Sequence, residues 1–443
     1  MSIAFLLAGL ALGLPLPPQQ SPAAPPAIRA FVGARILPIG GPPIERGVLV
    51  VADGKIRAVG ALDAVEVPGD AEVIDVAGKV LMPGLVCTHS HVGEPWGADS
   101  SGPIQPEVSS VDSVDATAAS VHRARAGGLT TINAMPGSGH LISGQTVYLK
   151  LREGKTVEDL AYRRADGAFD GGLKMANGTN PQRSSGPFPG TRAKSAALVR
   201  QSFLDAIAYR DKIAAAGDDA AKRPARDLGL EVLVEALAGT RVVHHHTHRA
   251  DDIMTVLRLA EEFGLRVVLH HVSEGWRVAD EIAKANVACS IILIDSPGGK
   301  LEAAGLAYDT GAVLAKAGVL VAVHTDDFIT DSRLFLRSAA FAVRGGMGRE
   351  QALEAVTLAG AKMLDLADRV GSLEVGKDAD FIVLDGDPLS VYTRVHQTWV
   401  EGEKVFDLAD PADRLIAEGG PGAGDRRPGV NCCAAIAGWE AAR

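Results

Sequence analysis

The feature that most constrains the fold of this chain is an alternation of short apolar runs with helical segments, which begins at Pro83. Apolar residues at helical spacing occupy the intervening segments, for example "DDIMTVLRLAEEFG" and "EGWRVADEIAKAN". Strand–helix alternation is typical of parallel sheets, and eight strands in this order predict a (β/α)8 TIM-like barrel over residues 83–365. The expected strands are "GLVCTHSH", "LTTINAMPG", "TVYLKL", "GGLKMANG", "RVVHHHTH", "RVVLHHVS", "VACSIILID" and "VLVAVHTDD".

Short strands flank the expected barrel on both sides. Residues 27–82 contain alternating apolar residues interrupted by Asp-Gly and Gly-Gly pairs, a pattern typical of β-hairpins. Residues 366–407 have the pattern of strands again, after a predicted helix in "GREQALEAVTLAGAKMLDL". A chain that opens and closes with strands around a barrel predicts an α/β protein with one small β-sandwich domain built from both segments.

Three further segments complete the predicted organisation. The stretch between Asn177 and Asp227 contains "GTNPQRSSGPFPGTR", which we expect to form an active-site loop. Residues 408–443 are rich in Gly, Pro, Ala and Asp and predict a flexible tail. Residues 1–26 join an apolar run too short to span a bilayer with a Pro/Gln/Ala-rich stretch, which predicts a signal peptide and linker. The expected location is periplasmic or extracellular, without stable membrane insertion after leader cleavage.

Composition excludes several classes of function. The chain has 443 residues, of which 47% are apolar and 22% charged, as expected of a globular protein with a large core. A net charge of −10 and the lack of basic runs argue against a nucleic-acid partner or an anionic membrane. Four cysteines are too few for a disulfide framework in a chain of this length. The expected partner is a small molecule or a dipeptide, and a homo-oligomer is compatible with the sequence.

Polar side chains that bind metals stand where four of the expected strands end. Barrel enzymes place their active sites at the carboxyl ends of the strands. Two imidazoles one residue apart in "THSH" also point to the same side of an extended chain. Imidazoles and a carboxylate at one barrel mouth predict a site for a divalent metal, with zinc the first candidate. The candidate residues at these strand ends are His89, His91, His246, His271 and Asp326, and Lys174 at the end of the fourth strand is either a surface lysine or a cation that binds a substrate carboxylate.

Several neighbouring residues compete for these roles. Asp327 follows Asp326 and points to the opposite side if the chain stays extended. The pair His270–His271 leaves the register of the sixth strand open, and we choose His271.

Other polar residues are candidates for contact with the substrate. His140, His248 and His324 are the imidazoles expected to line the pocket. The guanidinium groups of Arg183, Arg192 and Arg249 either bind a substrate carboxylate or are solvated. His122 and His396 lie within a helical stretch and a terminal strand, where a structural role is expected.

These motifs resemble those of a known family. "PGLVCTHSHVG", "HTHRADD", "HHVSEG" and "VAVHTDD" occur in the order found in the metal-dependent amidohydrolase superfamily. The closing "VGSLEVGKDADFIVLDGDPL" is similar to that family's second β domain, although no metal chemistry requires it. The resemblance covers roughly Ala30 to Asp407, and its nearest branch is the imidazolonepropionase-like and Xaa-Pro-dipeptidase-like amidohydrolases.

The resemblance implies a role for each candidate ligand. His89 and His91 would bind the more buried metal, and Lys174 would be an N6-carboxylated lysine that bridges two metals. His246 and His271 would bind the second metal. Asp326 would be both a metal ligand and the general acid/base.

Two departures from the family pattern leave the metal content open at one or two ions per chain. Cys87 stands where the family usually has an Asp two residues before the first ligand, which removes a supporting carboxylate. The lysine motif "GLKMANG" is not the commonest version, so a single-metal site stays open.

The resemblance implies a hydrolase of C–N bonds that acts on a linear amide, a cyclic amide or a small dipeptide. The expected chemistry uses metal-activated hydroxide, with Asp326 as general acid/base. One alternative is a deaminase of a ring amidine with a single metal. Another is a non-catalytic amidohydrolase-like scaffold, which the retained metal-binding side chains disfavour.

Overall fold

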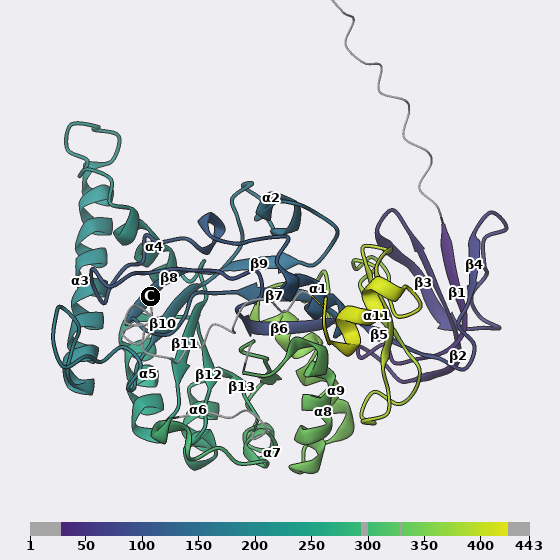
Figure 1. Ribbon diagram of the computed structural model, residues 1–443. Helices are drawn as coiled ribbons and strands as arrows, with labels where there is room; N and C mark the ends of the chain where they lie inside the picture. The colour runs from purple at the N-terminus through teal and green to yellow at the C-terminus, as the bar shows by residue number, and fades with distance from the viewer. Residues whose placement is uncertain (1–27, 294–299, 328, 424–443) are drawn as a thin grey trace, which may run out of the picture.

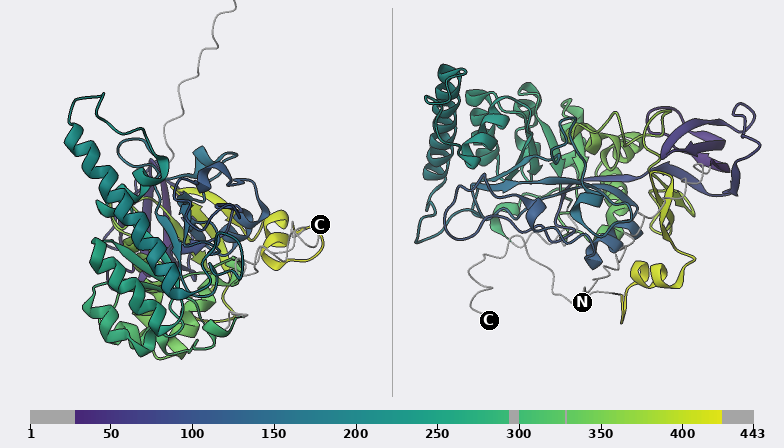
Figure 2. Two further views of the ribbon diagram at one scale, coloured as in Figure 1. Left: turned by 90° about the vertical axis from the view of Figure 1, so that its left-hand side faces the viewer. Right: turned by 90° about the horizontal axis from the view of Figure 1, so that it is seen from above.

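The computed structural model describes residues 28–293, 300–327 and 329–423, and the predicted leader and the pair Cys432–Cys433 lie outside them. The described chain is elongated, with the N-terminal strands at one end and the helix α3 (Arg192–Ala216) at the other (Figures 1 and 2). None of the described helices has the length and apolar character needed to cross a membrane.

The first sheet contains strands from both ends of the described chain, as the sequence predicts. Its order is β17-β16-β15-β5-β1-β2-β3, and β4 pairs with β1. Asp53 and Gly54 connect β2 to β3 with positive φ angles of 54° and 70°, the backbone of a tight hairpin turn. The strands are β1 (Arg29–Ile36), β2 (Ile44–Ala52), β3 (Lys55–Ala61), β4 (Glu72–Asp75), β5 (Val80–Pro83), β15 (Phe381–Leu384), β16 (Val395–Val400) and β17 (Glu403–Asp407).

Two further sheets contain the eight strands expected between residues 83 and 365. One has the order β14-β13-β12-β11-β10-β8, and the other has the order β6-β7-β9. Strands β10 to β14 are parallel to one another, and β6 is parallel to β7. The strands are β6 (Leu85–Ser90), β7 (Leu129–Ala134), β8 (Ile142–Gln145), β9 (Val147–Lys150), β10 (Leu173–Ala176), β11 (Val243–Thr247), β12 (Val267–His271), β13 (Ala288–Ile291) and β14 (Val321–Val323).

The third expected strand, "TVYLKL", runs against its neighbours, so the expected uniform strand–helix alternation is wrong at this point. β8 is antiparallel to β10, and β9 is antiparallel to β7. The chain leaves β7 through the short connection 135–141 and returns directly, and an antiparallel return needs no crossover helix.

The two sheets meet without strand pairing between β14 and β6 in the described part of the chain. Contacts beyond the end of β14 link them instead. The Thr325 amide donates to Cys87 Sγ over 3.3 Å, and the Asp326 amide donates to the His89 carbonyl over 3.1 Å. The link therefore lies at the ends of β6 and β14, where the candidate ligands stand.

Helices α5 to α8 follow the parallel strands and lie along one side of the six-stranded sheet (Figure 1).

Two helical predictions need correction. The expected helix at 348–366 is interrupted at Thr357, whose hydroxyl donates to the Leu353 carbonyl. The tail predicted from residue 408 contains α11, which Asp410 caps and Pro411 begins, and α11 packs against α1. The other α-helices are α1 (Ala119–Ala126), α2 (Val157–Leu160), α4 (Leu228–Leu237), α5 (Ala250–Phe263), α6 (Ala279–Lys284), α7 (Thr310–Lys316), α8 (Phe335–Arg344), α9 (Arg349–Ala355), α10 (Leu358–Met363) and α11 (Pro411–Glu418).

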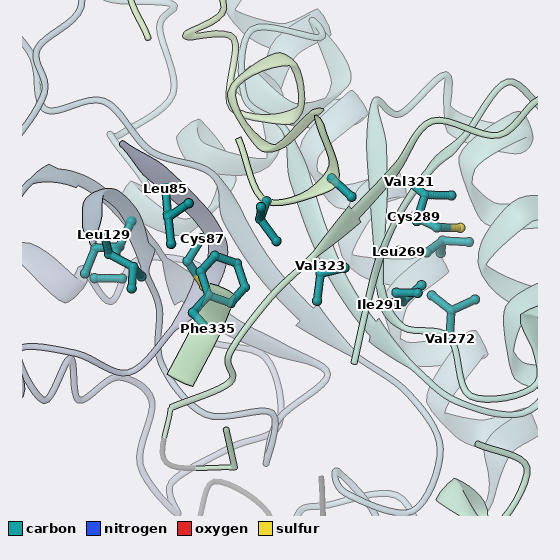
Figure 3. Packing of buried hydrophobic residues seen from close by; sticks show 14 of the residues in the cluster. Leu85, Cys87, Leu129, Leu269, Val272, Cys289, Ile291, Val321, Val323 and Phe335 are labelled. Carbon is teal, nitrogen blue, oxygen red and sulfur yellow. The ribbon is translucent and has the colours of Figure 1, made fainter. Parts of the chain in front are cut away.

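A continuous apolar core supports the strand ends. Figure 3 shows Leu85 and Cys87 of β6 on one side of this core and residues of β12, β13 and β14 on the other. Cys87 and Cys289 are fully buried free thiols, so both act as small apolar side chains in the packing. The candidate metal-binding side chains thus stand on, or shortly after, strands whose other residues are anchored in the core.

A buried ion network joins β9 to the terminal sheet. Lys150 of β9 is fully buried and contacts the carboxylates of Asp378, Asp380 and Glu401. Arg369 also donates to Asp378 over 2.9 Å. Because a buried lysine without these partners would carry a large desolvation cost, the network ties the two parts of the fold together.

We expect Asp378→Asn to lower the free energy of unfolding by about 2 kcal/mol at neutral pH. Burial opposes ionisation, but Lys150 and the other cations outweigh it and lower the pKa of Asp378 from 3.8 to about 2. A carboxyl with a lowered pKa stabilises the fold fully above its unfolded pKa and loses this effect as the pH falls toward the folded one. Urea unfolding should therefore show the full difference at about pH 6 and a shrinking difference between about pH 4 and 2. Asp218→Asn, on an exposed residue, is the control, and a pH-independent difference would contradict the prediction.

Candidate metal centre

One carboxylate lies among three imidazoles at the ends of β6, β12 and β14. Asp326 Oδ1 is 3.3 Å from His89 Nε2 and 3.1 Å from His91 Nε2, and Asp326 Oδ2 is 3.8 Å from His271 Nδ1. All four side chains are buried. The ligand atoms of His89, His271 and Asp326 lie within 4.8 Å of one another. The structure therefore brings together four of the six metal ligands expected from the sequence.

The backbone turns sharply where two of these residues stand. His271 and Asp326 have positive φ angles of 70° and 47°. Residues other than glycine adopt this region at a cost, and such residues cluster at functional sites. At Asp326 the turn is held by the hydrogen bond that its backbone amide donates to the His89 carbonyl.

The electrostatics of the cluster keep Asp326 ionised. Burial alone would raise the pKa of this carboxyl, but the imidazoles of His89, His91 and His271 lower it well below its ordinary value. Burial also lowers the pKa of His89, and the Lys174 ammonium lowers it further. A neutral His89 beside an ionised Asp326 is a pair of protonation states that binds a divalent metal.

Lys174 lies at the same centre. It stands on β10, is fully buried, and places Nζ 3.3 Å from His89 Nε2 and 3.3 Å from Met135 Sδ. A cation this close to an imidazole opposes metal binding, whereas a carbamate at the same nitrogen would be a ligand. The position is compatible with the expected modified lysine, which stays a prediction.

His270, the first histidine of the pair at the end of β12, makes different contacts. His270 Nε2 is 3.0 Å from His244 Nδ1, and His244 Nε2 is 3.1 Å from the Tyr148 hydroxyl. Burial lowers the pKa of His244 to about 3. His271 faces Asp326, as the chosen register requires, but His270 also groups with His89 and His324 within 4.8 Å.

His324, expected to bind substrate, contacts the candidate ligand His271. Its Nε2 lies 3.1 Å from His271 Nδ1, and its Nδ1 lies 2.8 Å from the Ser290 hydroxyl. Both ring nitrogens thus have protein partners. The ring orients His271, as groups behind a metal ligand commonly do.

His246 and His248 group with a residue that the sequence analysis missed. One nitrogen of each imidazole lies within 4.8 Å of the Glu302 carboxylate. Lys300 donates to His246 Nε2 over 3.2 Å. Lys300 and Glu302 follow β13. Sites in barrel enzymes lie beyond the carboxyl ends of the strands, and this rule could have indicated the segment after β13. No sequence motif identified these two residues.

Two other residues considered in the sequence analysis have partners outside the cluster. His140 Nε2 contacts the Asp99 carbonyl at 2.6 Å, and its ring lies beside Phe188. Asp327 accepts hydrogen bonds from the amide and hydroxyl of Ser332, and burial raises its pKa to about 6. The choice of Asp326 over its rival Asp327 agrees with this geometry.

The three candidate arginines have protein partners. Arg183 donates to backbone carbonyls, Arg192 pairs with Asp252, and Arg249 pairs with Asp251. These contacts favour structural roles for all three.

Cys87 occupies the place of the acidic residue that such motifs usually carry. Its thiol contacts the Thr325 hydroxyl at 3.3 Å and the His89 carbonyl at 3.1 Å, and burial raises its pKa to about 11. A neutral thiol at this position holds β6 against the end of β14 and adds no charge to the centre.

Unpaired ring nitrogens support a metal site. In the described chain His89 Nδ1, His246 Nδ1, His248 Nε2 and His271 Nε2 are buried without a hydrogen-bond partner. Buried polar atoms are rarely left unpaired, and an ion is one explanation when they are. The donor set of imidazoles and carboxylates fits zinc or another borderline divalent ion.

Comparisons with known proteins agree with this geometry. A model of the Amidohydrolase family matches residues 308–409. The crystal structure of an amidohydrolase from Thermotoga maritima MSB8 is 34% identical with a TM-score of 0.80, and the match covers 85% of this chain and 99% of that one. A prolidase complexed with N-methylphosphonate-L-proline is 18% identical with a TM-score of 0.54, over 86% of this chain and 99% of that one, and this shows a shared fold alone.

Curated relatives include enzymes of different activities. Amidohydrolase tasK of Hapsidospora irregularis is 27% identical over 394 residues, which are 82% of this chain and only 39% of that protein. Imidazolonepropionase of Rhizobium rhizogenes is 25% identical over 80% of this chain and 91% of its own. A 5-methylthioadenosine/S-adenosylhomocysteine deaminase of Teredinibacter turnerae is 31% identical over 38% of this chain and 46% of its own.

Proposed function

Because the chain belongs to the amidohydrolase superfamily, we propose that it is a metal-dependent hydrolase of C–N bonds in a linear amide, a cyclic amide or a small dipeptide. One observation carries this proposal: the Asp326 carboxylate lies within 3.8 Å of the imidazoles of His89, His91 and His271. A buried carboxylate among neutral imidazoles binds a divalent metal and also accepts protons, so one residue can serve both purposes.

We infer that His89, His91, His271 and Asp326 hold a divalent metal, with zinc the first candidate. When bound, such a metal lowers the pKa of water toward neutrality and polarises a carbonyl group. Asp326 would take the proton from the attacking water and then deliver it to the leaving nitrogen. An amide nitrogen leaves poorly unless it is protonated, so this transfer is needed for the reaction.

The content of the site beyond this metal is also a proposal. A carboxylated Lys174 would replace a buried cation near His89 with an anion and so favour a second ion. An unmodified Lys174 would favour a single metal.

The export of the protein remains a prediction, because it rests on residues 1–26. The possible homo-oligomer also remains a prediction.

Deamination of a ring amidine is the second candidate. The deaminase relative named above supports it, and the Lys174 ammonium beside His89 is compatible with a single metal. The same carboxylate would deliver a proton to departing ammonia. The retained cluster of imidazoles argues against the third candidate, a scaffold without activity.

A substrate panel separates the two activities. We expect purified protein to release an amine and a carboxylate from N-acyl amino acids, prolyl dipeptides or cyclic amides. A chelator should abolish that release, and added zinc should restore it. Release of ammonia from aminopurines alone would move the assignment to the deaminase. Full activity after the metal has been removed would contradict both.

A further inference from the structure

Three buried side chains form a second group with metal-ligand character. His246 and His248 come from the end of β11, and Glu302 comes from the short helix at Leu301–Ala303 after β13. They are 1%, 5% and 6% exposed, and one ligand atom of each lies within 4.8 Å of the others. Two imidazoles and one carboxylate are a ligand set that divalent zinc accepts.

Two of these side chains, His248 and Glu302, are held from behind so that a ligand atom remains. The Ser273 hydroxyl is 2.6 Å from His248 Nδ1, and the Thr179 amide donates to Glu302 Oε2 over 2.8 Å. In the described part of the chain, His248 Nε2 and Glu302 Oε1 have no hydrogen-bond partner. Groups that fix one atom of a ligand and leave the other toward a cavity are typical of metal sites.

A cation already occupies the neighbourhood of these ligands. Lys300 Nζ is 3.2 Å from His246 Nε2, 2.9 Å from Asn180 Oδ1 and 3.4 Å from Glu302 Oε1. Arg192 approaches the other carboxylate oxygen only to 3.6 Å. A buried carboxylate needs positive charge nearby, and the Lys300 ammonium supplies it at distances longer than close ion pairs.

The grouping differs from the one that the family resemblance implies, in which His246 and His271 share a second metal. The rings of His246 and His271 are 4.4 Å apart, but the ligand atoms of His246 come together with those of His248 and Glu302. His271 contacts Asp326 and His324 through Nδ1, and in the described chain its Nε2 has no hydrogen-bond partner. The group with His246 and His248 therefore offers the Glu302 carboxylate where the resemblance implies His271.

We propose that His246, His248 and Glu302 bind a second divalent cation, which displaces the Lys300 ammonium and lies apart from the ion held around Asp326. This site rests on the proposed metal-dependent function, because both concern divalent cations at neighbouring strand ends. Glu302 is the residue that decides between the two ligand sets, because the resemblance gives it no role.

The test measures zinc binding to the full-length protein. Apo-protein is titrated with zinc in competition with a chromophoric chelator, and bound zinc per chain is checked by elemental analysis. We expect two binding steps in the unmodified protein, and Glu302→Gln should weaken one of them about 10- to 100-fold. Lys300→Met should tighten the same step, because it removes the competing cation. Glu261→Gln and Lys316→Met, on exposed helical residues, are the matched controls.

The outcomes separate this site from the proposed function. Two unchanged zinc-binding steps in Glu302→Gln would overturn the second site. A single zinc-binding step that His89→Asn removes and Glu302→Gln does not would also overturn it. Either result would leave the first metal site in place. No zinc binding by the unmodified protein would overturn both. If Glu302→Gln fails to fold, as judged by circular dichroism, His248→Asn replaces it and should weaken the same step.

Discussion

Replacing Asp326 with Asn should lower kcat by about three orders of magnitude while the protein still binds its metal. The amide keeps the size of the carboxylate and one oxygen near His89 and His91, but it can no longer accept the proton of the attacking water. The loss should appear in kcat, because the proton is transferred only in the reacting complex. Steady-state kinetics together with elemental analysis of the variant test this expectation.

Asp327→Asn is the matched control for that variant. Asp327 is as buried as its neighbour but accepts hydrogen bonds from Ser332 on the other side of the chain. We expect its kcat to stay within about tenfold of the unmodified protein, with a change in stability as the main effect. Turnover close to that of the unmodified protein in Asp326→Asn, or an equal loss in both variants, would show that Asp326 is not the proton carrier.

His89→Asn is expected to have the second large effect, the loss of metal and of activity together. His89 is the one residue shared by two groups of close ligand atoms, with His271 and Asp326 in one and with His270 and His324 in the other. An amide cannot replace an imidazole nitrogen as a strong zinc ligand, so we expect metal affinity to fall about 100-fold or more and activity to fall with it.

The control for this change is His122→Asn, which alters an exposed histidine of α1 that is not among the candidate ligands. It should leave metal content and activity unchanged. If His89→Asn keeps its metal, the first metal centre lies elsewhere in the protein. If the centre is correctly placed, high concentrations of zinc should partly restore the activity of His89→Asn.

Strand periodicity made much of the candidate centre accessible from the sequence. The register of β10, β11 and β12 aligns Ala176, His246 and His270. His244 lies on the same face of β11 as His246, because side chains alternate along a strand. His245 lies on the opposite face and borders a cavity of about 590 Å³ between α3 and α5. Alternation alone could not choose between His270 and His271, because the backbone leaves the extended conformation at His271. Family resemblance, and not periodicity, selected His271.

Tertiary contacts decided what the sequence could not. An apolar run such as "TVYLKL" has the same pattern in either direction, so the antiparallel course of β9 was not predictable from it. The break at Thr357 depends on a hydroxyl that bonds back to the Leu353 carbonyl. Glu302 lies in the short helix Leu301–Ala303 and Lys300 directly precedes it, and only the fold brings them beside His246.

The most direct test of the central claim is the metal content of protein purified without chelator or added metal. Elemental analysis should find one or two divalent ions per chain, chiefly zinc, and two ions would also support the site at Glu302. Asp326→Asn should keep most of this metal, and His89→Asn should lose it. Protein that contains no divalent metal, and that gains neither metal nor activity when zinc, manganese or cobalt is added, would contradict a metal centre at Asp326.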